Sequence, residues 1–526
     1  MSSIIDLREE IEKTSSDSDL QIQEPREVGK QERNTYDQGN VPVYNPLEEI
    51  PSLAVFEGKD PNEVSFDGPN DLADPKNLSS IRKWIITLVI SLSALCITMI
   101  SSCWSMATDH IMEYFHIGHE VSILGISLYV FGFGFGPTFL SPISEYHGRR
   151  LTYVGGLFFV VCFQLIASFC DNIGGVLFSR FMTGFSGSAF LSVSSGTISD
   201  MFDKDQIGTA MVVYSIMPFL GPSLGPLISA AINSSIYFKW TFHVMLIFSG
   251  AVLVAVILLV PETYVPVLIK RKAIRLRKET GNEMLYAPLE RTPLTLFQST
   301  ILSSKRPLLL LTRDPMMLSL CFYSGLIMAI VYMFFVSFPY IFSEVYGFGI
   351  IGQGLSFMGL IVGIVFLLPS APFLQKLYQM QVKRNNGKHE PEFRLPQVMI
   401  GSVFISIGLF ILAWTSFPNC FWIGPLIGSV LYGFGTVLIF TGIFTYTVDA
   451  YRLFAASGMA ANSLVRSVMA GVFPLFTLQM YEKLGIHWAT TLLAFCATAL
   501  IPMPFIFYKY GAYLRSRSPF GWTDVN

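Results

Sequence analysis

Residues 84–106 read WIITLVISLSALCITMISSCWSM, an apolar run that contains no charged side chain. A helix needs about 20 predominantly apolar residues to cross a bilayer, so this run predicts a membrane-spanning helix. Eleven more predominantly apolar runs of similar length follow, near residues 119–140, 151–170, 174–200, 207–231, 240–260, 315–341, 350–374, 397–416, 421–446, 455–480 and 488–508. They predict an all-α integral membrane protein with twelve transmembrane helices.

The composition of the 526 residues agrees with this fold class and excludes others. Hydrophobic residues make up 52% of the chain and charged residues 14%, whereas soluble domains carry about 25% charged residues. The net charge of −2 gives no reason to expect a nucleic-acid partner. The seven cysteines lack the spacing of metal sites, and no phosphate loop or nucleophile–base pattern occurs. We therefore expect neither an enzyme nor a metal or organic cofactor.

A polar segment, residues 262–314, divides the twelve runs into two sets of six. Such a division is typical of transporters built from two pseudo-symmetric six-helix bundles. The expected organisation is a disordered cytosolic tail (1–80), a first bundle (81–261), a basic central loop (262–314), a second bundle (315–508) and a cytosolic C-terminal tail (509–526). The first tail is polar and acid-rich and has no apolar run of spanning length.

Lys and Arg residues gather on one side of the predicted membrane. With the N-terminus inside, the inner loops contain many of them, including the cluster KRKAIRLRK (270–278), whereas the outer loops contain only Lys239 and Lys483. The positive-inside rule then places both termini in the cytosol. We expect a multi-pass protein of the plasma membrane, with an internal membrane as the alternative. Binding of anionic lipid is an alternative reason for the basic cluster.

The fourth run contains LFSRFMTGFSGS (177–188), in which Arg180 is the single charge. At 1.5 Å per residue, Arg180 lies roughly 10 Å from the outer end of its helix. Gly184, Gly187 and Ser188 follow at i+4, i+7 and i+8, so Arg180 shares the small-residue face that contacts other helices. Ionisable residues on such faces usually mark ion or substrate pathways. The alternative is a side chain that reaches the outer surface.

Five stretches in order resemble the major facilitator superfamily, and more closely its fungal twelve-spanner drug:proton antiporters, which include polyamine and azole exporters. The stretches are FDGPNDLADPKNLSSIRKW (66–84), GFGFGPTFLSPISEYHGRR (132–150), LGPSLGPLISA (220–230), PETYVPVLIKRKAIRLRKETG (261–281) and YTVDAYRLFAASGMAANSLVRSVMAGVFPLF (446–476). The resemblance implies the major facilitator fold, a lipid bilayer, a small-molecule substrate and a proton as partners, the proton gradient as energy source, and a functional monomer. The antiporter stretch usually closes with two glycines, where this chain has Ser229 and Ala230.

The resemblance assigns Arg180 to proton coupling. A proton-coupled device also needs an acid that titrates, and a nearby Arg would lower the pKa of such an acid. Glu120, at the outer start of the second run, is the first candidate, and Asp109, just past the first run, is the second.

The GRR turn between the second and third runs predicts a cytosolic gate. Gly148 permits the tight turn, and the charged residues can form bonds that break and re-form as two halves rock. Acids recur at the inner ends of the fourth and tenth runs, where a carboxylate at a helix C-terminus needs a basic partner; coincidence between two loop acids is the alternative. The gate residues are Glu145, Gly148, Arg149, Arg150, Asp200 and Asp449.

In the fifth run, Pro218, Pro222 and Pro226 recur at i, i+4 and i+8, and Gly221 and Gly225 form a close-packing stripe. The prolines predict a repeatedly bent helix. Under the resemblance this helix seals the route between substrate and proton paths; a purely architectural kink is the alternative.

Aromatic residues of the second, seventh and tenth runs are candidates for a substrate cavity, because rings hold amphiphilic or cationic compounds. Packing between helices or against lipid is the alternative. Arg466, in the eleventh run, would hold substrate anions or brace the second half. The candidate cavity residues are Tyr129, Tyr323, Tyr332, Phe335, Tyr432 and Arg466.

The function predicted from these observations is a proton-coupled antiporter that exports small drugs or xenobiotics, polyamines among the open possibilities, by alternating access. One alternative is a downhill facilitator or importer of a nutrient, which would not require Arg180 and the proline helix. A second is a non-transporting membrane sensor.

Overall fold

The computed structural model describes residues 62–68, 71, 73–202, 206–291 and 296–521. Twelve of its helical segments are long and apolar enough to cross a membrane, as the sequence predicts. The first six are formed by α2 (Ser80–Ser102) with η2 (Ser105–Ala107) and α3 (Thr108–Phe115), α4 (His119–His147), α5 (Arg149–Phe169), α6 (Ile173–Gly187) with α7 (Ala189–Ser192) and α8 (Ser194–Met201), α9 (Ile207–Asn233), and α10 (Lys239–Leu259).

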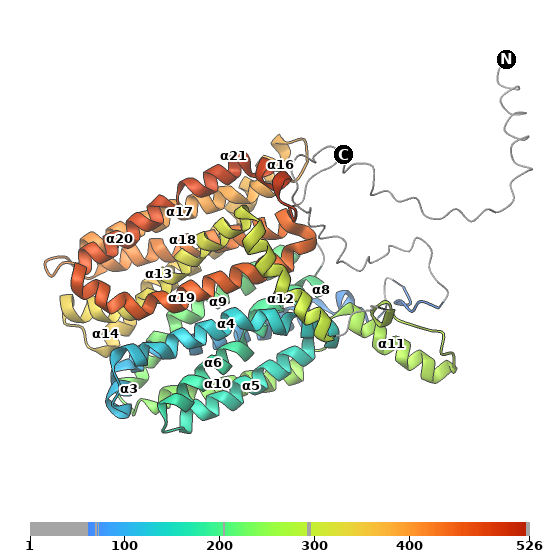
Figure 1. The fold of residues 1–526 in the computed structure, drawn as a ribbon, viewed down its shortest axis with the longest axis horizontal. Coiled ribbons are helices and arrows are strands. Elements are labelled where there is room, and N and C mark those ends of the chain that lie inside the picture. Colours follow the sequence, from blue (N-terminus) through green and yellow to red (C-terminus); the bar gives the residue numbers. More distant parts are fainter. Residues whose placement is uncertain (1–61, 69–70, 72, 203–205, 292–295, 522–526) are drawn as a thin grey trace, which may run out of the picture. The chain divides into compact units, whose positions relative to one another are not determined.

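The second six segments follow the central segment of the chain. They are α13 (Pro315–Tyr346), α14 (Ile350–Leu355) with α15 (Met358–Val365) and α16 (Leu367–Arg384), η4 (Pro391–Arg394) with α17 (Leu395–Thr415), α18 (Ile423–Tyr451), α19 (Ala455–Leu484), and α20 (Ile486–Ala499) with α21 (Pro502–Arg517). In Figure 1 the blue-to-green helices and the yellow-to-red helices form two neighbouring groups. Most segments extend several residues past the apolar runs, because a helix continues into polar sequence where its backbone bonds still form.

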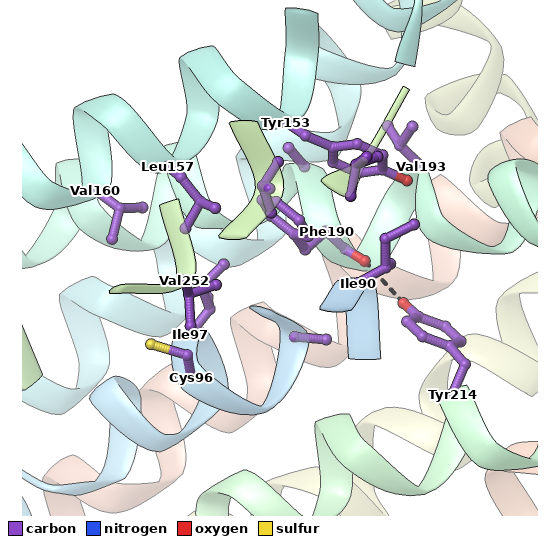
Figure 2. Packing of buried hydrophobic residues seen from close by; sticks show 14 of the residues in the cluster. Ile90, Cys96, Ile97, Tyr153, Leu157, Val160, Phe190, Val193, Tyr214 and Val252 are labelled. Carbon is purple, nitrogen blue, oxygen red and sulfur yellow. Dashed lines mark hydrogen bonds between the residues drawn. The ribbon is translucent and has the colours of Figure 1, made fainter. Parts of the chain in front are cut away.

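The first six segments pack around a shared apolar core. Ile90 and Ile97 of α2 are fully buried among residues of α5, α7 and α10, including Tyr153 and Phe190 (Figure 2). The hydroxyl of Tyr214 on α9 donates to the Phe190 carbonyl oxygen at 2.8 Å, a bond that Figure 2 also shows. This contact ties α9 to the broken helix of the fourth segment.

Glycine crossings repeat in the two halves. A Cβ on Gly132 of α4 would lie 2.2 Å from the Phe181 carbonyl oxygen of α6, and one on Gly184 would lie 2.1 Å from that of Tyr129. In the second half, a Cβ on Gly363 of α15 would lie 2.1 Å from the Val430 carbonyl oxygen of α18. Since α4 and α6 belong to the second and fourth segments, and α15 and α18 to the eighth and tenth, the crossing recurs six segments later. This supports an internal repeat.

The polar segment 262–314 contains helices that the sequence analysis did not identify: α11 (Val265–Thr280), η3 (Pro288–Arg291) and α12 (Leu296–Arg313). Their polar composition gave no spanning signal. Helix α12 contacts both α4 and α19, one from each half of the chain, and so bridges them (Figure 1).

The expectation of a disordered tail over 1–80 is wrong for the described residues between 62 and 80; residues 1–61, 69, 70 and 72 lie outside the described residues. Val64 is buried with Ala273 of α11, and Val64 N–H donates to the Tyr286 carbonyl oxygen at 3.0 Å. Lys272 of α11 pairs with Asp67 at 2.7 Å and with Asp71 at 3.3 Å. Burial disfavours the charged form of Lys272, but its hydrogen bonds to the two carboxylates outweigh burial and raise its pKa.

Candidate transport site

Arg180 of α6 is fully buried and satisfied by backbone oxygens. Its Nε donates to the Gly125 carbonyl at 2.9 Å, and its two terminal nitrogens donate to Ile100 at 2.8 Å and to Ser101 at 2.9 Å. The guanidinium carbon also lies 4.5 Å from the ring centre of Tyr129. Among the described residues, the side chain therefore neither reaches the surface nor pairs with a carboxylate. It joins α6 to α2 and α4 of the first half.

The carbonyls of Ile100 and Ser101 need Arg180 because the first segment is interrupted. Helix α2 ends at Ser102 and the chain continues as the 3-10 turn η2. The last carbonyls of a helix have no partner within it, and an unpaired carbonyl is costly in an apolar interior. A cation at a helix C-terminus is also favoured by the helix dipole. Arg180 therefore caps the break in the first segment.

The pairing expected between Arg180 and an acid is absent from the described contacts. Glu120 is exposed, and its carboxylate accepts from Gln479 Nε2 of α19 at 3.1 Å. Asp109 is exposed on α3, which continues the first segment beyond the end predicted from sequence. In this conformation the donors of Arg180 bond to the carbonyls that the helix break frees, and its pairing with either acid stays a prediction. The Glu120 contact instead joins the two halves.

The two halves also meet through a hydroxyl pair next to Arg180. Ser101 Oγ lies 3.2 Å from the hydroxyl oxygen of Tyr332 on α13, and both side chains are buried. Ser101 thus offers its carbonyl to Arg180 and its hydroxyl to the second half. Tyr332 in turn interacts electrostatically with Arg466. Two buried or partly buried cations, one per half, are therefore connected through one serine and one tyrosine.

Arg466 lies near the middle of α19, with its guanidinium carbon 5.5 Å from the ring centres of both Phe440 and Phe444 on α18. Its charge interacts with the phenols of Tyr332 and of Tyr214, the latter on α9 of the first half. Among the described residues, no ion pair or hydrogen bond to the Arg466 guanidinium is found.

The aromatic candidates for the cavity are all buried and mostly bonded to their neighbours. The Tyr129 hydroxyl donates to the Ile97 carbonyl at 2.8 Å and the Tyr432 hydroxyl to that of Ile327 at 2.7 Å. Phe335 packs on Tyr332 with ring centres 5.0 Å apart. Tyr323 is 1% exposed. A small cavity lies instead between α9, α13, α15 and α18, lined by residues that include Phe219, Pro222, Ser223, Met328, Leu360 and Thr436.

Helix α9 runs without interruption through its three prolines, Pro218, Pro222 and Pro226. Two of its glycines pack closely against the first segment. A Cβ on Gly221 would lie 2.0 Å from Thr98 Oγ1, and one on Gly225 would lie 2.1 Å from Ser102 Oγ. Near the end of α9, Ser229 and Ala230 stand where the family usually has glycines, and there the glycine at the contact belongs to the partner helix.

That partner is α14. A Cβ on Gly354 would lie 2.4 Å from Ala230 Cβ, so the second half approaches α9 closely at this point. The missing glycine at Ala230 therefore does not loosen the contact.

The predicted gate charges pair within each half. Arg149, at the start of α5, lies 3.4 Å from Asp200 of α8. Arg394, in the equivalent position of the second half, lies 3.1 Å from Asp449 of α18. The basic partners expected for both acids are therefore present, but neither pair crosses between the halves, because each joins adjacent helices of one bundle. Glu145 interacts electrostatically with Arg149 and with Arg306 of α12.

Glu262 is the functional candidate that sequence reasoning missed. Its buried carboxylate accepts from the backbone N–H groups of Arg149 at 2.8 Å and Arg150 at 3.3 Å, and so caps the start of α5. Gly148 has φ +103°, and a Cβ there would lie 2.2 Å from Glu262 Oε2. The Arg150 side chain donates to the Ile257 carbonyl at 2.9 Å. The signal available in the sequence was an acid directly after the sixth apolar run, on the same predicted side of the membrane as the GRR turn.

Comparison with known proteins agrees with this architecture. The chain is similar to "Probable drug/proton antiporter YHK8" of Saccharomyces cerevisiae, with 49% identity over 90% of this chain and 93% of the relative. It is also similar to "Efflux pump atB" of Aspergillus terreus, with 40% identity over 86% of this chain and 89% of the relative.

Solved structures with the same fold include a partially occluded inward-open conformation of the Escherichia coli xylose transporter XylE. Its TM-score is 0.55 and its identity 14%, over 81% of this chain and 99% of that chain. Residues 90–474 match the family described as the Major Facilitator Superfamily. The two repeated halves, the twelve spanning segments and this match lead to one conclusion: the chain belongs to the major facilitator superfamily.

Proposed function

We propose that the protein is a proton-coupled antiporter that exports small, chemically varied compounds by alternating access. The buried charge of Arg180, held only by backbone oxygens and two aromatic rings, is the observation that carries the proposal. Intramembrane charges are costly and usually mark ion or substrate paths. The similarity to proteins named as drug/proton antiporters and efflux pumps supports the same reading.

Alternating access requires contacts between the halves that break. The Glu120–Gln479 and Ser101–Tyr332 contacts are of this kind, since each joins one residue from each half. When that end of the bundle opens, Glu120 loses Gln479 and becomes free to bind a proton. We propose Glu120 as the coupling acid, with Asp109 as the second candidate, and Arg180 as the fixed charge that disfavours a proton on an approaching acid.

In this proposal the protein works as a monomer in the plasma membrane, with both termini in the cytosol and the gate residues Arg149, Arg150 and Asp200 at the cytosolic end. It makes and breaks no covalent bond in its substrate, and the proton gradient supplies the energy without a cofactor.

The test is the accumulation of labelled compounds in cells with and without the protein. A panel of anionic, neutral and cationic fluorescent compounds should contain at least one whose accumulation falls when the protein is present. A protonophore should restore that accumulation. Export that persists after the gradient is collapsed would contradict proton coupling.

A further inference from the structure

Arg466 is a cation with unused hydrogen-bonding capacity. A guanidinium carries five N–H donors, and no hydrogen bond to this one is found among the described residues. Its contacts are the faces of Phe440 and Phe444, which stabilise the charge without accepting from its N–H groups in its own plane. Arg180, by contrast, has three backbone acceptors. The donors of Arg466 are therefore available to an acceptor that the chain does not supply.

The surroundings of Arg466 favour an anionic acceptor. Every Asp and Glu of the twelve spanning segments except the exposed Asp109 lies within two residues of the end of its segment. The charges deeper in the bundle that are buried or partly buried are those of Arg180 and Arg466, and both are positive. A positive field in a medium of low dielectric attracts anions and repels cations such as polyamines.

An apolar surface continues from the guanidinium toward the small cavity. Phe440, which Arg466 touches, packs on Phe219 of α9 with ring centres 4.9 Å apart. Phe219 lines the cavity together with Pro222 and Thr436. A charged anchor, two aromatic side chains and a cavity lined from both halves thus follow one another through successive contacts.

We propose that Arg466 anchors the anionic group of a small aromatic or apolar organic anion, whose body lies against Phe440 and Phe219. The inference deepens the proposed function, on which it rests, by naming the substrate class. A carboxylate suits this site because it can accept two parallel hydrogen bonds from one guanidinium. The neighbouring rings then bury the apolar body and favour it over an inorganic ion.

Binding to the purified full-length protein in lipid nanodiscs tests the proposal without transport. Three probes share one ring system: 2-naphthoate is an anion, 2-naphthamide is neutral and 2-naphthylmethylamine is a cation. We expect 2-naphthoate to bind at least about tenfold more tightly than the other two. Arg466→Gln should remove that preference while weak binding of 2-naphthamide persists, which shows that the variant is folded. Arg466→Lys should keep part of it, because a lysine keeps the charge but not the paired donors.

Lys483→Gln is the matched control, since Lys483 is an exposed cation on the same helix and should leave all three affinities unchanged. Equal affinity for the three probes, or an anion preference that survives Arg466→Gln, would overturn the proposal. Inorganic phosphate that binds as tightly as 2-naphthoate would reduce the site to a counter-ion site and also overturn it. Anion binding through Arg466 without gradient-driven export would instead contradict the proposed function alone.

Discussion

Ser101 and Tyr332 join the two halves of the transporter by a 3.2 Å contact between their hydroxyl groups. The same Ser101 gives its carbonyl to Arg180. The charge of the fourth segment and the interface between the halves are therefore linked through one residue. A movement that separates α2 from α13 must change the surroundings of Arg180.

Ser101→Ala removes the hydroxyl but keeps the carbonyl that Arg180 uses. A net hydrogen bond contributes about 1 kcal/mol, so the population in which this end is open should rise about fivefold. Spin-label distances between positions 113 and 483, both exposed and on different halves, would measure that population in a cysteine-free background. Tyr432→Phe is the control, since the Tyr432 hydroxyl bonds within the second half. An unchanged distance distribution in Ser101→Ala would show that the contact does not hold the halves together.

Gly225→Val should separate α9 from α2. The new side chain would collide with Ser102 Oγ and with the Met99 carbonyl oxygen. Because the Met99 carbonyl belongs to the backbone of α2, relieving the collision requires a movement of the helix. Overpacking typically costs about 1–3 kcal/mol, so we expect a lower thermal unfolding temperature and loss of export. Gly250→Val is the matched control, because nothing lies within 4 Å of a Cβ at that position. Equal stability of the two variants would contradict the close approach of α9 to α2.

Glu262→Ala should destabilise the start of α5. The substitution leaves the N–H groups of Arg149 and Arg150 without their acceptor, and loss of a helix cap costs about 1 kcal/mol or more. Thermal unfolding in detergent measures the effect, with Glu279→Ala as the control. Glu279 is exposed on α11 and pairs only with Arg275 among the described residues. Similar unfolding temperatures for both variants would remove Glu262 from this role.

The contacts of Lys272 on α11 with Asp67 and Asp71 should depend on pH. Hydrogen bonds from the backbone of Ala73 and Asp67 lower the pKa of Asp71 below its ordinary 3.8. The contribution of the ionised Asp71, mainly to the local fold of the pre-membrane segment and to a smaller extent to its contact with Lys272, is therefore present above pH 3.8 and is lost as the pH falls through the lowered pKa. The raised pKa of Lys272 gives the opposite pH dependence. The contribution of Lys272 is present below pH 10.5 and is lost as the pH rises through the raised pKa.

Limited proteolysis of the pre-membrane segment would follow these contacts. Protection from proteolysis should stay constant between pH 3.8 and pH 10.5 and should fall when the pH is lowered below 3.8. Asp71→Asn should weaken protection near neutral pH. Protection that rises with acid would contradict the assignment.

The twelve segments could be predicted because the length and apolar composition of each run are by themselves enough to indicate a membrane-spanning helix. The burial of Arg180 could be predicted too, because Gly184 and Gly187 share its helix face. Its partners could not, since they are carbonyls freed by the break after Ser102, and hydropathy does not show a break inside an apolar run. Helices α11 and α12 were missed because their residues are too polar for a spanning signal. The pairing of Arg394 with Asp449 depends on the internal repeat, which sequence alone only suggests.

Proton coupling through Arg180 is the central claim, and gradient-driven uptake into inside-out membrane vesicles tests it most directly. Vesicles with an acidic interior should accumulate a compound identified by the cell assay, and an ionophore that removes the pH gradient should abolish the accumulation. Arg180→Ala should abolish it while Arg180→Lys, which keeps a charge, retains part, with both variants present in the membrane in equal amounts. Uptake by Arg180→Ala that equals the unsubstituted protein and still follows the gradient would contradict the account.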